Sequence, residues 1–214
     1  MEVVFCDNHI LVVKKPAGVP TQPDGQHTLS LEEHAKEWIK KTFQKPGNVF
    51  LEAVHRLDKP VRGIVLFART SKALSRINEM MREQQIHKVY HAWVEGVPCS
   101  KEGILEHYLS HDSFHAKVVG SQHPQAKKAR LFYTIISQED KKCLLEVVLY
   151  TGRYHQIRAQ LAAIGCPIVG DKKYGSSCFY ETEGISLQNV RLEFIHPVSK
   201  LPLKFCLNDP SINP

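Results

Sequence analysis

The chain has 214 residues, of which 43% are hydrophobic, and carries a formal net charge of +6. This composition is typical of a globular protein with one large domain, or with two small lobes that share a core. No apolar run approaches the roughly 20 residues that a membrane-spanning helix needs, and the N-terminus lacks the pattern of a signal peptide. We therefore predict a cytoplasmic protein without membrane association. Its basic charge favours a polyanionic partner but does not identify one.

Secondary structure can be predicted in the first half of the chain from apolar runs and capping residues. Residues 10–13 predict a buried strand, which a Lys-Lys-Pro-Ala-Gly segment ends. Ser30 and Glu33 have the spacing of a capping box and predict a helix that ends before Pro46. A short apolar strand at 63–67 precedes a second helix, capped by Thr70 or Ser71. Its core-facing residues are Ala73, Leu74, Ile77, Met80 and Met81.

Strands dominate the second half of the prediction. Residues 89–97 alternate as a strand does, and residues 131–136 and 144–150 predict a hairpin. A helix at 156–164 stops at Gly165, and the tail adds strands at 190–194 and 201–207. Because strands and helices do not alternate regularly, we predict an α+β fold with a mostly antiparallel sheet. No linker divides the chain, so we expect a single domain over residues 1–214.

The segment from His55 to Gly63 places a carboxylate among cations. Asp58 follows Arg56 and precedes Lys59 and Arg62, in a loop that Pro60 and Gly63 make irregular. Positive charges at this range keep a carboxylate ionised and orient it. The segment therefore predicts either a reactive aspartate or an ordinary surface turn with ion pairs.

Two further segments carry candidate functional residues. Residues 88–96 form a strand in which Tyr90 is either a functional aromatic or part of the core. Residues 151–158 combine a strand end, a glycine turn and a helix start, where Arg153 and His155 could meet a phosphate. Arg158 lies inside that helix, and taken alone it would be an exposed arginine. A loop over 165–175 follows the helix.

In this order, the four segments closely resemble the RluA-type family of pseudouridine synthases. The matching motifs are His-Arg-Leu-Asp, Lys-x-Tyr-x-Ala, Gly-Arg-x-His-Gln-Ile-Arg, and Pro-Ile-x-Gly-Asp followed by Tyr-Gly. The resemblance runs from the Lys-Pro-Ala-Gly segment to Pro202. His55 and the His-Gln-Ile-Arg segment favour this branch over the small-subunit type. Two positions depart from the family pattern: Arg62 stands for its usual serine and Tyr154 for its usual threonine.

The resemblance implies the pseudouridine synthase fold, in which a bent mixed sheet flanked by helices surrounds a central RNA-binding cleft. It implies the catalytic domain alone, without the S4-like domain that many family members carry. Asp58 would be the nucleophile, Tyr90 would pack against the target base and assist proton removal, and Arg158 would form an ion pair with Asp58. Arg56 would fill the space that the flipped uridine leaves. The expected RNA-binding residues are Arg56, Arg62, Lys88, Lys127, Lys128, Arg130, Arg153 and His155.

The implied reaction isomerises a uridine of ribosomal or transfer RNA and adds no atoms. It requires no metal and no cofactor, and the chain has no phosphate-binding glycine loop or spaced metal ligands. Because the target base must leave its stack, we expect a looped or deformed RNA to be preferred over a duplex. Residues 16–27 are candidates for choosing the RNA. We expect a monomer, since no heptad repeat or other dimerisation device is evident.

Three alternatives remain open at this point. The first is an RNA-binding protein of the same fold without catalysis. The second is a glycoside hydrolase with paired carboxylates, for which Asp171 is a distant partner of Asp58. The third is a metal site formed by histidines that recur every four residues, namely His107, His111 and His115.

Overall fold

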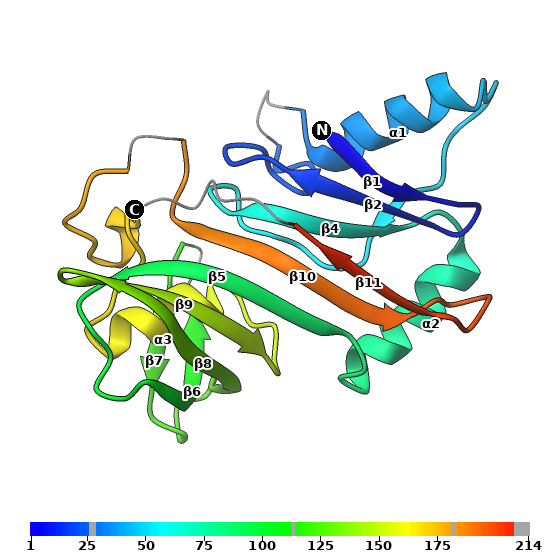
Figure 1. Cartoon of the computed structure of the whole chain (residues 1–214). Coiled ribbons are helices and arrows are strands. Elements are labelled where there is room, and N and C mark those ends of the chain that lie inside the picture. The colour runs from blue at the N-terminus through cyan, green and yellow to red at the C-terminus, as the bar shows by residue number, and fades with distance from the viewer. Residues whose placement is uncertain (26–28, 113, 181–182, 208–214) are drawn as a thin grey trace. The chain divides into compact units, whose positions relative to one another are not determined.

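A computed structural model of the protein, drawn in Figure 1, describes residues 1–25, 29–112, 114–180 and 183–207. These residues group into two compact units. The first unit contains Met1–Ile86 and Arg191–Leu207, and the second contains His87–Val190. Each unit combines helix with sheet, so the predicted α+β class is confirmed. The single-domain organisation stays a prediction.

The first unit is a sheet with two helices. Its strands lie in the order β1-β2-β4-β10-β11, and β3 also pairs with β4. The pairings β1–β2, β2–β4, β3–β4 and β10–β11 are antiparallel. The elements are β1 (Glu2–Cys6), β2 (Ile10–Lys15), α1 (Leu31–Thr42), β3 (Glu52–Ala53), β4 (Arg62–Ala68), α2 (Ser71–Arg82), β10 (Leu187–Ile195) and β11 (Pro202–Cys206). Strand β10 starts among residues of the second unit and ends in the first.

Both helices of the first unit begin as their sequences predict. Ser30 and Glu33 form the complete capping box of α1, and the Thr70 side chain accepts a hydrogen bond from the Ala73 N–H at the start of α2. Helix α2 buries Ala73 and Ile77 against apolar residues of β2 and β4, with Leu74, Met80 and Met81 partly buried around them. Removing this apolar surface from water is the main source of the unit's stability.

The second unit is built on an antiparallel sheet in the order β5-β9-β8-β6-β7. Strands β8 and β9 form the predicted hairpin, and Asp140 in its turn has a φ of 49°. The elements are β5 (His87–Glu95), β6 (Glu102–His111), β7 (Ala116–Val119), β8 (Lys127–Glu139), β9 (Lys142–Leu149), α3 (Gln156–Ala163) and the 3-10 helix η1 (Lys172–Tyr174). Within the part of the chain that the structure describes, none of the helices combines the length and apolar character of a membrane span.

Candidate active site

Asp58 lies in the loop that leads into β4 of the first unit. The Val61 N–H donates a hydrogen bond to the Asp58 carbonyl oxygen over 2.9 Å, which closes a turn immediately before the strand. Just before Asp58, buried and exposed residues alternate: His55 and Leu57 are buried, whereas Arg56 is exposed. Asp58 itself is half-buried. The loop therefore has a fixed inner side and leaves the predicted nucleophile partly accessible.

Leu57, which precedes Asp58, is fixed through its backbone by Thr21. The Thr21 hydroxyl donates a hydrogen bond to the Leu57 carbonyl over 2.8 Å and accepts one from the Leu57 N–H at 3.1 Å. Thr21 is 3% exposed and Leu57 5%. Because both backbone groups are satisfied by one side chain in a buried place, the position of Leu57 depends directly on Thr21.

Lys59, which follows Asp58, is fixed from the other side. Its carbonyl accepts hydrogen bonds from the Gly18 N–H at 2.9 Å and from the Lys15 ammonium at 3.1 Å. Gly18 has a φ of 79°, a backbone conformation that glycine adopts most readily. The residues on both sides of Asp58 are therefore bound to the segment that runs from the end of β2 to Thr21.

Lys15 is a buried lysine close to the candidate nucleophile. Its side chain is 0% exposed, and its nitrogen also donates to the carbonyls of Pro16 and Val19, at 3.0 Å and 2.6 Å. Burial lowers the pKa of Lys15 to about 7, while the negative charge of Asp58 acts in the opposite direction. The three carbonyl acceptors match the three donors of a protonated lysine.

The sequence prediction treated Lys15 only as the end of a strand, and it gave Gly18 and Thr21 no part in holding the Asp58 loop. The signal available in the sequence was the Lys-Pro-Ala-Gly segment. It did not reveal the buried position of Lys15, because a lysine that follows an apolar strand and precedes a proline is easily taken for a surface residue. Residues 16–27 were expected to choose the RNA. Of these, Gln26 and His27 lie outside the described residues, and the segment up to Thr21 serves to hold the Asp58 loop.

Tyr90 and Lys88 lie on β5 of the second unit. Tyr90 is 6% exposed and stands opposite Val147 of β9. Lys88 is 8% exposed, and burial lowers its pKa. A side chain at Gly152 would come within 3.6 Å of the Lys88 nitrogen, so the glycine turn lies close over this ammonium group. Lys88 was expected to contact RNA, but little of its side chain is accessible in this position.

Arg158 of α3 forms a buried ion pair with Asp171. Its guanidinium donates to both carboxylate oxygens, at 2.7 Å and 2.9 Å, and also lies over the Tyr174 ring, 4.9 Å from its centre. The two residues are 4% and 1% exposed, so the interpretation of Arg158 as an exposed helix arginine is wrong. The ion pair expected between Arg158 and Asp58 stays a prediction, because the two residues belong to different units.

His155 precedes α3 with a left-handed φ of 48°. Its Nδ1 lies 2.8 Å from the Tyr174 hydroxyl. Burial, together with the charges of Arg158 and Lys173, lowers the pKa of His155 to about 3. The imidazole is therefore neutral at physiological pH and offers no positive charge to a phosphate, although the sequence suggested such a contact.

The exposed cations of the predicted RNA face come from β8 and from the turn before α3. Arg153 Nε donates to the Lys128 carbonyl over 3.0 Å, and the Arg130 N–H donates to the Thr151 hydroxyl over 2.8 Å. Glu106 of β6 forms ion pairs with Lys128 at 3.5 Å and with Arg130 at 3.1 Å. The structure thus brings Lys128, Arg130 and Arg153 together, with Lys127 at the start of the same strand.

The histidines of the third alternative do not form a ligand cluster. His107 and His111 lie on β6, and His107 Nδ1 is 3.0 Å from the Gln160 amide nitrogen. Over residues 1–25, 29–112, 114–180 and 183–207, no group of three or more His, Cys, Asp or Glu side chains could hold a metal ion.

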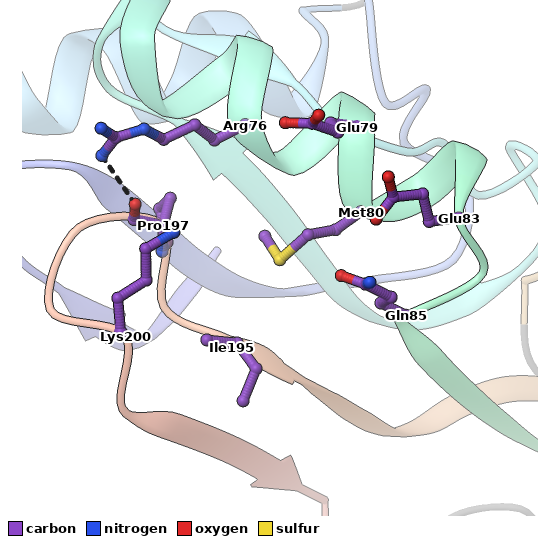
Figure 2. A pocket seen from close by; sticks show the side chains of 8 residues that line it. All are labelled: Arg76, Glu79, Met80, Glu83, Gln85, Ile195, Pro197 and Lys200. Carbon is purple, nitrogen blue, oxygen red and sulfur yellow. Dashed lines mark hydrogen bonds between the residues drawn. The ribbon is translucent and has the colours of Figure 1, made fainter.

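A pocket of about 190 Å³ lies in the first unit, between α2 and the turn that joins β10 to β11 (Figure 2). Arg76 closes one side of it with a 2.8 Å hydrogen bond to the Pro197 carbonyl. Glu79, Glu83 and Lys200 add charges of both signs to its lining. None of the residues predicted to act in catalysis or RNA binding lines this pocket.

Comparison with known proteins identifies the family. Residues 9–163 match the model of the RNA pseudouridylate synthase family, so the chain belongs to that family. The tRNA pseudouridine synthase C of Vibrio parahaemolyticus is 28% identical over 230 residues, covering 98% of this chain and 91% of that protein. The dual-specificity RNA pseudouridine synthase RluA of Vibrio vulnificus is 29% identical over 204 residues, covering 92% and 79%. The predicted RluA-type resemblance is confirmed.

Solved structures support the same fold. Human RNA pseudouridylate synthase domain containing 4 superimposes with a TM-score of 0.80 at 21% identity, over 98% of this chain and 89% of the human one. The related human domain-containing protein 1 gives a TM-score of 0.78 at 22% identity, over 98% and 83%. The chain is therefore an RNA pseudouridine synthase, an isomerase that acts on uridine in RNA.

Proposed function

We propose that this enzyme isomerises a specific uridine of transfer or ribosomal RNA and that Asp58 is its nucleophile. The main support is the position of Asp58 between two residues whose backbones are held by Thr21, Lys15 and Gly18. A half-buried carboxylate in such a rigid loop can be aimed at a substrate atom without a cost for ordering the loop. Two similar proteins support this choice of RNA: the tRNA pseudouridine synthase C of Vibrio parahaemolyticus and the ribosomal large subunit pseudouridine synthase C of Buchnera aphidicola.

The reaction breaks the bond between N1 and C1′ and forms a bond between C5 and C1′. Asp58 promotes the first step by covalent attack at C1′, by stabilising positive charge there, or by taking a ribose proton. The detached uracil then turns and reattaches to C1′ through C5. In the covalent route this attack breaks the Asp58–C1′ bond, in the ribose-deprotonation route Asp58 returns the proton to the ribose, and in each route the C5 proton is then lost. The number of atoms is unchanged, because the uracil loses one proton from C5 and gains one at N1.

The other proposed roles follow from the family motifs. Tyr90 would pack against the uracil and assist removal of the C5 proton, and Arg158 would keep Asp58 ionised through an ion pair. The bidentate bond to Asp171 supports this role, since it fixes the orientation of the guanidinium. The same bond gives no support to a glycoside hydrolase, because it occupies the carboxylate of Asp171 that would have to act as the second catalytic group.

Contacts to RNA would come chiefly from exposed cations. Arg56 would enter the space left by the flipped uridine, and Arg62 adds a charge beside the catalytic loop. The cations grouped by β8 and the following turn, Lys127, Lys128, Arg130 and Arg153, would bind phosphates. Lys88 and His155 would contribute less, because both are buried. We also propose that the enzyme acts as a monomer and in the cytoplasm.

Release of tritium from RNA that contains 5-tritiated uridine tests the proposal. Asp58→Asn should lower the rate by about 1,000-fold or more, the usual effect of removing a catalytic nucleophile. Asp140→Asn makes the same chemical change at an exposed hairpin turn and should leave the rate unchanged. Equal rates for the wild-type enzyme and Asp58→Asn would refute the assignment. Free uracil among the products would point to hydrolysis instead.

A further inference from the structure

Tyr154 is the position at which this chain replaces the family's threonine, and its ring is held in a defined place. The ring stacks on His155, with centres 3.8 Å apart and planes at 18°. The His111 ring of β6 lies 5.3 Å from it, at a tilt of 51°. Nevertheless, 38% of Tyr154 is exposed. An aromatic side chain that is both supported and accessible can receive a further flat group.

The support beneath Tyr154 is rigid. The Tyr174 hydroxyl accepts a hydrogen bond from the Ala116 N–H at 2.9 Å and can donate to Nδ1 of His155, which lies 2.8 Å away. The Tyr174 ring is in turn covered by the Arg158 guanidinium. His155 is 8% exposed, and its pKa of about 3 keeps its own ring neutral in the physiological range. The ring is therefore pre-organised for binding, which reduces the entropy lost when a ligand binds.

Positively charged side chains lie close to Tyr154 in the sequence and on the neighbouring strand β8. Arg153 is exposed and precedes Tyr154, and its hydrogen bond to the Lys128 carbonyl joins it to the cations of β8. Arg130 of the same strand lies 5.0 Å from the ring centre of Tyr150, a second tyrosine with 41% exposure. Aromatic side chains interleaved with cations are typical of surfaces that bind single-stranded nucleic acid, where bases stack and phosphates pair with the cations.

We propose that Tyr154 stacks on an unpaired base of the substrate RNA while Arg153 and Lys128 bind neighbouring phosphates. This inference builds on the proposed function, because it takes RNA as the ligand. A threonine at this position has no ring to stack, so the contact distinguishes this chain from relatives with the usual motif. Stacking does not require a particular base, since every base has a π-face. The residue therefore selects for an unpaired nucleotide and not for a sequence.

Binding of a fluorescein-labelled 12-nucleotide oligocytidylate to the full chain tests this proposal. Cytidine is not isomerised, so the measurement is independent of the reaction. Tyr154→Thr should raise Kd by about 5- to 150-fold, the range that corresponds to loss of one base–aromatic stack. Tyr154→Phe keeps the ring and should stay within about twofold of wild type. Comparable unfolding midpoints for the three proteins would show that the loss of affinity is local.

The salt dependence of Kd distinguishes the stacking contact of Tyr154 from the charge contact of Lys128. Tyr154→Thr should leave the slope of log Kd against log salt unchanged, whereas Lys128→Gln should reduce that slope by about 0.7. In oligocytidylate that contains 5-iodocytidine, irradiation should produce an adduct on Tyr154. Equal Kd values for wild type and Tyr154→Thr, or adducts formed only elsewhere, would overturn the proposal. Tritium release is measured separately, so failure of the stacking contact and failure of the proposed function are distinguishable.

Discussion

Replacing Thr21 by valine tests whether the Asp58 loop depends on a single hydroxyl group. Valine keeps the shape of threonine but removes the bonds to both backbone groups of Leu57, which measure 2.8 Å and 3.1 Å. Since Thr21 and Leu57 are 3% and 5% exposed, water cannot easily replace that hydroxyl. Each of the two buried groups left unsatisfied costs about 1–3 kcal/mol, so we expect the free energy of unfolding to fall by about 2–6 kcal/mol.

The same substitution should reduce catalysis, because Leu57 is the residue before Asp58. A small displacement of a catalytic group can lower the rate by about 100-fold. Urea unfolding followed by circular dichroism measures the stability, and tritium release measures kcat. Thr21→Ser is the matched control, since it keeps the hydroxyl and loses one buried methyl group worth about 1 kcal/mol. The reasoning is refuted if Thr21→Val unfolds at the same urea concentration as wild type, or if Thr21→Ser loses as much stability.

Two further perturbations test the buried charges. Asp171→Asn breaks the buried pair with Arg158 and should lower the free energy of unfolding by about 3–5 kcal/mol. Thermal unfolding measures this loss of stability, with Asp140→Asn as the control. Equal melting temperatures for the two variants would contradict the prediction. Lys15 has a pKa of about 7 in the folded protein against 10.5 as its ordinary value. The folded state therefore binds fewer protons between these pH values, and stability should rise with pH across that window, by at most about 1.4 kcal/mol per unit. Burial lowers the pKa of Lys88 as well, so urea unfolding at pH 7 and pH 9 should show a larger rise in wild type than in Lys15→Met. Equal rises in the two proteins would exclude the contribution of Lys15.

The sequence predicted those helix starts and turns that are specified by residues close together in the chain. The capping box at Ser30, the cap at Thr70 and the β8–β9 hairpin are each encoded within a few residues, and all three are confirmed. Strand β6 was not predicted, because its outward-facing positions include apolar residues: Ile104 is 50% exposed and Tyr108 38%. Such a strand lacks the clear alternation of polar and apolar residues that identifies a sheet face.

The candidate site was predicted only in part, for a similar reason. The family motifs identified Asp58, but the bonds that hold its loop join residues far apart in the chain, such as Thr21 and Leu57. No local pattern encodes that pairing. Arg158 was recognised as important, yet its pairing with Asp171 depends on how the loop after α3 folds back over the helix. Side-chain partners of this kind are set by tertiary structure and not by spacing in the sequence.

The bonds that hold the Asp58 loop have an evolutionary consequence. Lys15, Gly18 and Thr21 all belong to the same unit as Asp58, whereas the supported ring of Tyr154 belongs to the other unit. A mutation at position 154 can therefore change how tightly unpaired RNA is bound while the bonds that hold the catalytic loop stay intact. The strength of RNA binding can then change over evolution without disturbing the bonds that orient Asp58.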